Sequence, residues 1–160
     1  PIPDPCSTIP SVRIAIGSDH AGFEFKQRLT SLLARQGIAF DDVGTASPDS
    51  VDYPDFAADV ARRVADGRAD RGILVCGTGI GMAIAANKVP GVRAAVVWNE
   101  ESARLSRAHN DANVMAVGGR TTPMSDAEAI LRAFLHTPYE GGRHDRRLAK
   151  IAALEHRTSS

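Results

Sequence analysis

A cysteine stands where an apolar run gives way to a glycine-rich turn. Cys76 follows Ile-Leu-Val at 73–75 and precedes the turn at 77–81, after which residues 82–88 have the composition of a helix. This spacing predicts a thiol at the carboxyl end of a strand, facing the start of a helix. Unpaired N–H groups there favour an anion, so the position suits a reactive thiolate or an oxyanion that develops on a substrate. A small buried core cysteine is the alternative.

The glycines of this turn stand at alternating positions, 77, 79 and 81. That spacing does not fit the dinucleotide-binding fingerprint, and no Gly-Lys-Ser/Thr follows as it would in a nucleotide-binding P-loop. Alternating glycines still expose several backbone N–H groups, which suit an oxyanion or a phosphate. The turn therefore predicts an anion site of another kind.

Two more segments carry side chains that could do chemistry. Asp19 and His20 directly follow an apolar run, and a histidine there could grip a phosphate or move a proton. An aspartate that caps the next helix, beside an exposed histidine, is the alternative. His109 lies in a polar segment before another apolar run; a polar helix end is its alternative, and a nucleophile–base pair with Cys76 stays open on residue types alone.

The C-terminal segment is locally basic. Arg143 and Arg147 are four residues apart and share one face of a predicted helix, so they could converge on a phosphate. A solvated basic face is the alternative. The histidines show no paired metal-binding spacing and Cys76 has no cysteine nearby, so we expect no metal site. The histidines are His20, His109, His136, His144 and His156.

Strands and helices must alternate to position these groups. Apolar runs predict strands at 12–17, 38–43, 72–76, 92–98 and 113–117, with helices between them and two more at about 124–135 and 142–156. This pattern predicts an α/β fold: a single-domain three-layer αβα sandwich around a Rossmann-like five-stranded parallel sheet. The domain spans 12–160 after a proline-rich extension at 1–11.

Ligands of such sheets bind outside the carboxyl ends of the strands. That rule selects the loops at 18–22, 44–45, 76–81 and 118–120, and it brings Cys76 to the same edge as Asp19.

The composition excludes several classes of function. The 160 residues hold 19 basic and 19 acidic side chains, so no global charge favours nucleic acid or a membrane surface. The apolar runs are too short to span a bilayer, and the first residues lack the pattern of a signal peptide. Two cysteines do not make a disulfide framework. We therefore expect a cytoplasmic protein.

Read together, these segments resemble the type B ribose-5-phosphate isomerases and the related galactose-6-phosphate isomerase subunits. The resemblance covers the chain from about Val12 to the final helix. The matching stretches are GSDHAGF at 17–23, DYP at 52–54, CGTGIG at 76–81, IAANK at 84–88, HNDANV at 109–114, GGR at 118–120 and EGGRHDRR at 140–147.

The resemblance implies an aldose–ketose isomerase without cofactor or metal, which interconverts ribose 5-phosphate and ribulose 5-phosphate through a cis-enediolate. It makes Cys76 the base that moves a proton between C2 and C1, with Thr78 assisting by its hydroxyl. It makes His109 the group that opens the sugar ring. The implied binding residues are Asp19, Tyr53 and Asn110 for the sugar, Gly77, Gly79, Ile80 and Gly81 for the enediolate, and His20, Arg120, Arg143 and Arg147 for the phosphate.

The resemblance also implies a site shared between two subunits of a homodimer, or of a tetramer built from such dimers. His109 and Asn110 would then face Cys76 of the partner chain, and the C-terminal helix would pack on the partner. One branch of the family carries a glutamate later in the loop in place of the cysteine; Met82 and Ala83 are not acidic here, so the cysteine branch fits.

Two alternatives to this function remain open. A six-carbon substrate, allose 6-phosphate or galactose 6-phosphate, is the first. A non-catalytic nucleotide-binding module is the second. The failed fingerprint disfavours that module, as does the lack of an acidic residue directly after Val43 at the end of the second strand.

Overall fold

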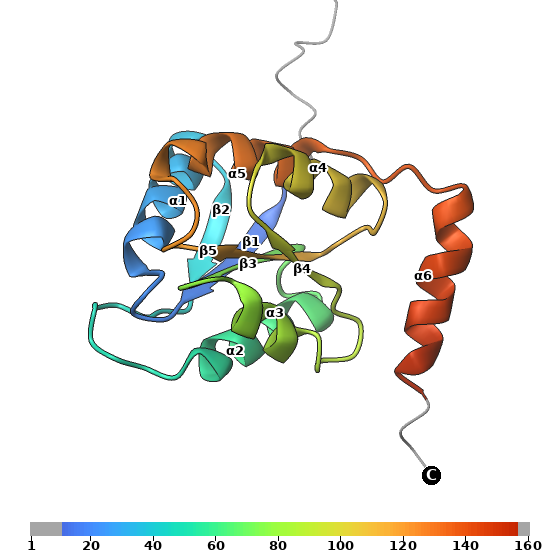
Figure 1. Cartoon of the computed structure of the whole chain (residues 1–160), viewed down its shortest axis with the longest axis horizontal. Helices are drawn as coiled ribbons and strands as arrows, with labels where there is room; N and C mark the ends of the chain where they lie inside the picture. The colour runs from blue at the N-terminus through green and yellow to red at the C-terminus, as the bar shows by residue number, and fades with distance from the viewer. Residues whose placement is uncertain (1–10, 157–160) are drawn as a thin grey trace, which may run out of the picture.

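The computed structural model describes residues 11–156, which alternate between strand and helix in the predicted order (Figure 1). The strands are β1 (Arg13–Ser18), β2 (Ala39–Asp42), β3 (Arg71–Cys76), β4 (Ala94–Val97) and β5 (Val114–Gly118). The helices are α1 (Phe23–Arg35), α2 (Tyr53–Ala65), α3 (Ile80–Ala86), α4 (Glu100–Ala108), α5 (Ala127–His136) and α6 (Arg143–Leu154), with a 3₁₀ turn, η1 (Met124–Asp126).

The sheet has five strands in the order β2-β1-β3-β5-β4, and every neighbouring pair is parallel. The predicted α/β fold is therefore confirmed. The chain leaves β1 toward β2 on one side, whereas β3 pairs with the other side of β1. The loops that follow β1 and β3 diverge at this point, which is where open parallel sheets bind ligands.

Helices cover both faces of the sheet, as the αβα prediction requires. Figure 1 shows α1, α4 and α5 on one face and α2 and α3 on the other. Successive side chains of a strand point to opposite faces, so Ile73 and Val75 enter the core beneath α1 and α5 while Leu74 and Cys76 enter the core beneath α2 and α3. Burying each large aliphatic side chain of this kind contributes about 1.5–3 kcal/mol.

The sequence explains the helices that flank the site. In α1 the buried residues recur at helical spacing, and α2 has Pro54 in its first turn, where a missing N–H costs nothing. After α2, Gly67 adopts a φ of +77°, which favours glycine and turns the chain toward β3.

Most predicted ranges differ from the structure by one or two residues. The second and fourth strands are shorter than the apolar runs at 38–43 and 92–98, because the ends of those runs lie outside the hydrogen-bonded ladder. The helix predicted at 124–135 begins instead with the turn η1, in which the Asp126 N–H donates to the carbonyl of Pro123. The extension predicted at 1–11 lies outside the described residues apart from Ser11.

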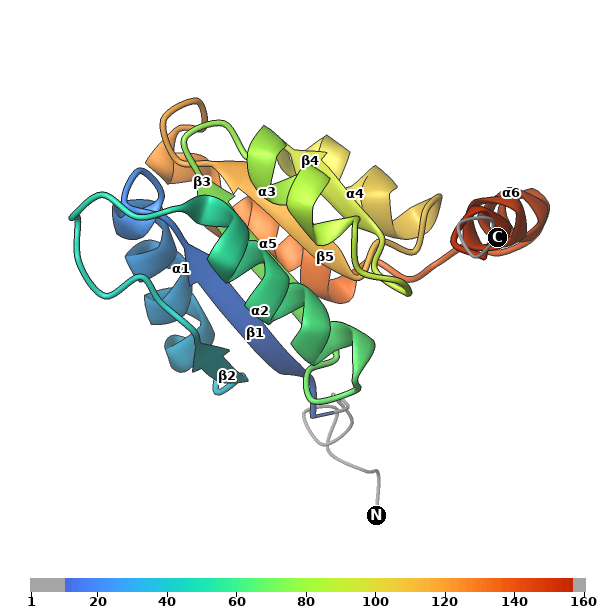
Figure 2. The ribbon, with the colours of Figure 1, turned by 90° about the horizontal axis from the view of Figure 1, so that it is seen from below.

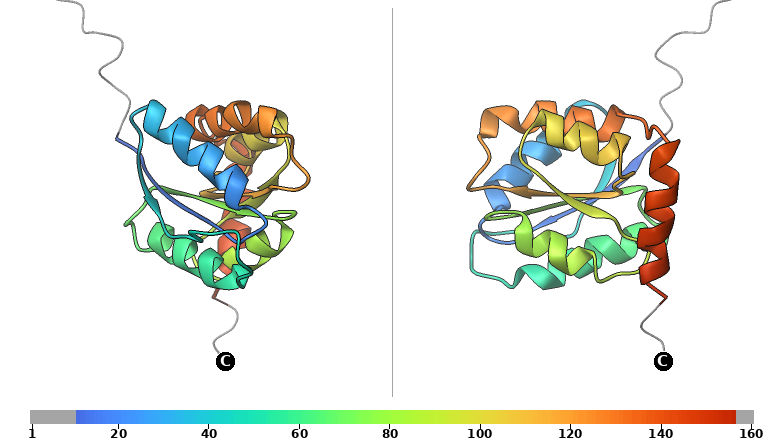
Figure 3. Two further views of the ribbon diagram at one scale, coloured as in Figure 1. Left: turned by 90° about the vertical axis from the view of Figure 1, so that its left-hand side faces the viewer. Right: turned by 45° about the vertical axis from the view of Figure 1, so that its right-hand side comes forward.

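Helix α6 lies apart from both helix layers, beside the β4 edge of the sheet (Figures 2 and 3). A cleft of about 620 Å³ separates it from that edge, and the Gly91 N–H reaches across to Glu155 Oε1 at 2.9 Å. Ile151 and Leu154 are 46% and 58% exposed, so the helix leaves apolar side chains uncovered. No helix within residues 11–156 is long and apolar enough to cross a membrane.

Candidate active site

A cavity of about 450 Å³ opens at the carboxyl edge of the sheet, where the loops after β1 and β3 diverge. Residues from these two loops and from the starts of α2 and α3 form its walls. They are Asp19, Tyr53, Cys76, Gly77, Thr78, Ile80, Gly81 and Ile84. Ile84 was not predicted, although its position one helical turn after Ile80 could have indicated it. The cavity thus confirms that the loops after β1 and β3, which the carboxyl-edge rule selected, lie together.

Cys76 ends β3 at the wall of this cavity with only 5% of its surface exposed. Its Sγ accepts a hydrogen bond from the Gly79 N–H at 3.1 Å. Gly79 has a φ of +80°, which favours glycine and turns this N–H back toward the sulfur. Helix α3 has only seven residues, so the Gly79 N–H is the main local donor directed at the sulfur. The predicted placement of the thiol is confirmed.

The loop after Cys76 is held by the end of β5. Gly119 donates its N–H to the Cys76 carbonyl at 2.7 Å, and Arg120 donates its N–H to the Gly77 carbonyl at 3.1 Å. The Arg120 side chain also lies against Gly77, since a methyl group there would meet the guanidinium and its Cδ at 3.6 Å. A cation therefore lies beside the loop that follows Cys76, where it can meet an anionic ligand.

Thr78 and Tyr53 are the exposed polar side chains of the cavity. Thr78 Oγ1 accepts from the Ile80 N–H at 3.3 Å, which leaves its own hydroxyl proton for a ligand. Tyr53 lies over Gly81, where a methyl group would come within 2.6 Å of the phenol ring. The missing side chain at Gly81 thus makes room for the ring.

Asp19 is buried, and its Oδ1 accepts from the Gly22 N–H at 3.0 Å. The residue that caps α1 is Gly22 itself, so Asp19 does not have the capping position given as its alternative. His20 Nδ1 accepts from the Val51 N–H at 3.3 Å. This contact assigns the ring proton of a neutral His20 to Nε2, which can then donate to a ligand.

A second group of predicted site residues lies far from this cavity. His109 caps the end of α4 before β5, at the opposite edge of the sheet. In the register of β3 with β5, Val114 pairs with Gly72, and four residues of strand, about 13 Å, separate Gly72 from Cys76. Asn110 lines the cleft beside α6. Within one chain, the predicted ring-opening histidine and the predicted base do not meet.

The two predicted phosphate-binding arginines of the C-terminal segment belong to this distant group. Arg143 begins α6, and Arg147 follows one turn later with its Nη1 3.5 Å from the Arg143 carbonyl. Both side chains are exposed on one face of the helix, as their spacing predicted. Neither borders the cavity that contains Cys76.

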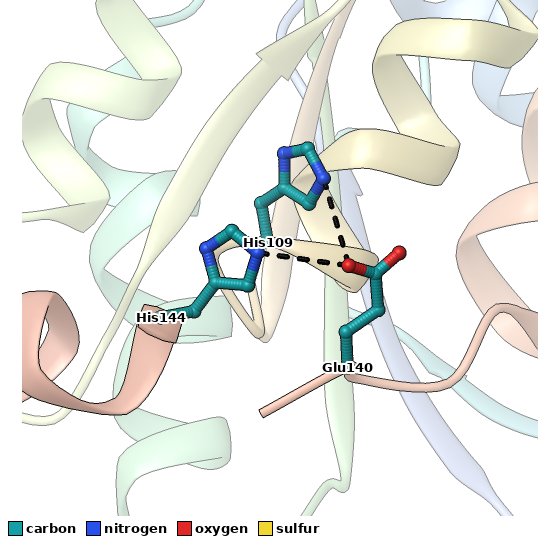
Figure 4. A group of neighbouring side chains, drawn as sticks. All are labelled: His109, Glu140 and His144. Atoms are coloured by element: carbon teal, nitrogen blue, oxygen red, sulfur yellow. Dashed lines mark ion pairs between the residues drawn. The ribbon is translucent and has the colours of Figure 1, made fainter. Parts of the chain in front are cut away.

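The distant group also contains a cluster that the sequence did not indicate. His109, Glu140 and His144 bring their ligand atoms within 4.8 Å of one another (Figure 4). The spacing of the histidines predicts no metal site, yet the described residues bring two histidines and a carboxylate together as possible ligands. His109 and His144 come from different helices, so only the four-residue spacing of Glu140 and His144 could have indicated the cluster.

Tyr139 ties the start of α6 to the segment before it. Its hydroxyl donates to Asp145 Oδ1 at 2.8 Å. Local desolvation, together with this hydrogen bond to a carboxylate, raises the pKa of Tyr139 to about 12. The contact helps to fix the helix that carries His144.

Comparisons with known proteins identify related sequences and structures over nearly the whole chain. The family model described as Ribose/Galactose Isomerase matches residues 14–151. Ribose-5-phosphate isomerase B of Escherichia coli is 48% identical over 145 residues, which cover 91% of this chain and 97% of that protein.

Two solved structures extend these similarities to the fold. Ribose-5-phosphate isomerase B of Clostridium thermocellum is 48% identical with a TM-score of 0.88, and the match covers 89% of this chain and 97% of that one. Ribose-5-phosphate isomerase B of Mycoplasma genitalium, solved with bound ribulose 5-phosphate, is 42% identical with a TM-score of 0.88 over 94% of this chain and 100% of that one.

Proposed function

The chain belongs to the ribose/galactose isomerase family, and from that premise we propose that it interconverts D-ribose 5-phosphate and D-ribulose 5-phosphate. One observation carries the proposal: a thiol at the wall of a carboxyl-edge cavity, with the Gly79 N–H directed at its sulfur. The choice of ribose 5-phosphate as substrate rests on the relatives named ribose-5-phosphate isomerase B, because the cavity alone does not distinguish one small sugar phosphate from another.

In the proposed reaction Cys76 acts as a thiolate base. It removes the proton from C2 of the open-chain aldose and returns it to C1 after electrons have shifted through a cis-enediolate, while the proton on the hydroxyl oxygen moves to the other oxygen. Backbone N–H groups of the loop at 77–81 and the Thr78 hydroxyl stabilise the enediolate oxygen. The reaction rearranges protons within the substrate and has no net redox change, so it needs no external oxidant.

The other predicted residues then divide between two chains. Asp19, His20, Tyr53 and Arg120 act from the chain that supplies Cys76. The separation within one chain supports a homodimer in which a partner subunit contributes its His109 to open the furanose ring. The partner would also contribute Asn110 for the sugar and Arg143 and Arg147 for the phosphate.

The C-terminal helix supports this arrangement as well. The uncovered Ile151 and Leu154 of α6 give it an apolar face to bury on a partner, which follows the predicted role of the helix. We also propose that two such dimers can pair into a tetramer. We place the enzyme in the cytoplasm and in the pentose phosphate pathway, as its proposed substrate implies.

Replacing Cys76 by Ala tests the base. Solvent deuterium should no longer appear at C2 of ribose 5-phosphate, while calorimetry should still detect binding, because the phosphate ligands remain. Cys76→Ser is the matched variant, since it replaces the thiol with a hydroxyl of similar shape whose anion is not accessible near neutral pH. Near-normal exchange in either variant would sink the assignment.

A panel of phosphorylated aldoses tests the substrate. Ribose 5-phosphate should give the highest kcat/KM, ahead of allose 6-phosphate and galactose 6-phosphate. A higher value for a six-carbon sugar would move the function to that substrate. Tight binding of ATP or NAD without any turnover of sugar phosphates would instead support the nucleotide-binding module.

Subunit complementation tests the shared site. Cys76→Ala and His109→Asn chains, each inactive alone, are mixed, unfolded and refolded together. Random pairing of a dimer gives heterodimers that contain one intact site, so activity should return to about a quarter of that of the unmodified enzyme. No recovery, from chains that sedimentation shows to have exchanged, would contradict a site built from two subunits.

A further inference from the structure

We propose that His109, Glu140 and His144 form a binding site for a transition-metal dication, with Zn²⁺ as the best match. The two histidines come from the end of α4 and the first turn of α6, and the carboxylate comes from the segment between α5 and α6. The site lies at the opposite edge of the sheet from Cys76, and the proposed isomerisation makes no use of a metal there.

The distances between the donor atoms suit a shared ion better than direct contacts. Glu140 Oε2 lies 3.8 Å from His109 Nε2 and 3.6 Å from His144 Nε2, which exceeds hydrogen-bond length. Ligands at 2.0–2.1 Å from a tetrahedral Zn²⁺ stand about 3.3 Å apart, so shifts of a few tenths of an ångström bring each nitrogen to that spacing from this oxygen. Figure 4 shows both nitrogens directed at the same carboxylate oxygen.

The imidazole rings must turn out of their stack to share an ion, because an imidazole nitrogen binds a metal in the plane of its ring. They stack with their centroids 4.5 Å apart and their planes inclined by 19°. The ligand atoms of all three side chains lie within 4.8 Å of one another, so the two nitrogens must approach by at most about 1.5 Å to share a tetrahedral ion. His109 is more than one-third exposed, which leaves its ring free to make this movement.

The backbone brings the three residues together before any ion arrives. The Glu140 N–H donates to the carbonyl of Ala108 at 3.0 Å, which fixes Glu140 beside the residue that follows Ala108, His109. Gly141 and Gly142 then adopt φ values of +67° and +58°, which favour glycine and turn the chain sharply into α6. That turn brings the first turn of α6, with the buried His144, back over Glu140.

The donor set decides which ion fits. Two imidazoles and one carboxylate suit Zn²⁺ and its transition-metal neighbours, whereas Mg²⁺ and Ca²⁺ prefer oxygen ligands. Three protein ligands leave one position of a tetrahedral ion for water or for an anion such as phosphate. A bound ion would also occupy Nε2 of His109; resting on the proposed function, this predicts that Zn²⁺ inhibits turnover by blocking ring opening.

Calorimetry with zinc chloride tests the site directly. The protein used carries Cys6→Ser and Cys76→Ala, so that neither thiol can bind the ion. One Zn²⁺ should bind per chain, and Glu140→Gln or His144→Gln added to this background should each weaken binding by about tenfold or more. His136→Gln, which changes an exposed histidine outside the cluster, should leave the affinity unchanged.

Absence of stoichiometric binding would overturn the proposal, as would binding that Glu140→Gln and His144→Gln leave unchanged while circular dichroism shows both variants folded. Turnover assays then separate this site from the proposed function. Zn²⁺ should inhibit the unmodified enzyme, and Glu140→Gln should raise the inhibitory concentration by the same factor as it weakens binding. Full activity with Zn²⁺ bound at the cluster would contradict the role of His109 in ring opening and would leave the metal site established.

Discussion

Replacing Gly118 by Ala should displace the loop at 77–81, which we propose to be catalytic, without touching any predicted catalytic side chain. Gly118 ends β5 and pairs with Cys76 across the ladder, so it lies directly against the loop that follows the cysteine. A methyl group at Gly118 would lie 2.8 Å from the carbonyl carbon of Thr78 and 2.9 Å from its Cα. It would also overlap the side-chain oxygen of Thr121.

The size of the effect follows from these distances. Ordinary van der Waals contact of a methyl carbon begins at 3.4 Å, so the Thr78 backbone must withdraw by about 0.6 Å. Misplacing catalytic groups by about 1 Å can cost 10²-fold in rate, and overpacking of this kind costs about 1–3 kcal/mol of stability. We therefore expect kcat to fall by about 10- to 100-fold, which corresponds to about 1.4–2.7 kcal/mol in the barrier.

Two further variants separate loop displacement from the side-chain clash. Thr121→Ala alone should keep nearly normal kcat, because it removes only the hydroxyl and methyl that lie near Gly118. The double variant with Gly118→Ala should recover much of the lost melting temperature and still turn over slowly, since the clash with Thr78 persists. Coupled assays of ribulose 5-phosphate formation and thermal melts measure both quantities. This reasoning would be refuted if Gly118→Ala kept kcat within about twofold of normal, or if the double variant recovered the full kcat of the unmodified enzyme.

Two other predictions concern the tyrosines. Gly81→Ala places a methyl group 2.6 Å from the phenol ring of Tyr53, which is 40% exposed and can swing outward. Initial-rate kinetics should therefore show KM rising several-fold, with little change in melting temperature. An unchanged KM would contradict a role for that ring in the cavity. The raised pKa of Tyr139 means that the folded chain holds the phenol proton more tightly than the unfolded chain, so its contribution to stability is intact below about pH 10 and is lost as the pH rises through 12. Asp145→Asn should lower this pKa in a tyrosinate absorbance titration, and an unshifted titration would show that the hydrogen bond has no influence on it.

The sequence predicts most of the fold because each strand is a short apolar run between polar turns. Both faces of the sheet are covered, so every residue of the central strand β3 after Arg71 is apolar or small, and the position of the strand stands out in the sequence. Edge strands carry weaker signals: β4 is partly exposed, and its predicted run at 92–98 extends past both ends of the true ladder. Strand ends are set by pairing with a neighbour, which a single apolar run does not encode.

Some residues of the candidate site are positioned by the sheet topology, and others are positioned by the packing of turns and side chains. Parallel strands place Cys76 and Asp19 at one edge whatever the detailed packing, and that prediction is confirmed. The approach of His144 to His109 depends on the turn at Gly141 and Gly142 and on a backbone hydrogen bond between distant segments. Residue spacing predicts which side chains are neighbours within one helix or strand, so it could not reveal a contact between His109 and His144, which belong to two different segments.

The sheet also explains why the predicted site residues of one chain form two groups. The loops that carry Cys76 and His109 emerge from opposite ends of the β3–β5 ladder, whose hydrogen bonds fix their separation at about 13 Å or more. Loop motion cannot close this distance, because each loop is anchored to a buried strand, and uniting them within one chain would require breaking that ladder. A second chain that presents its opposite edge to the cavity brings the same groups together without unfolding any strand. A rigid parallel sheet therefore favours a site assembled from two subunits.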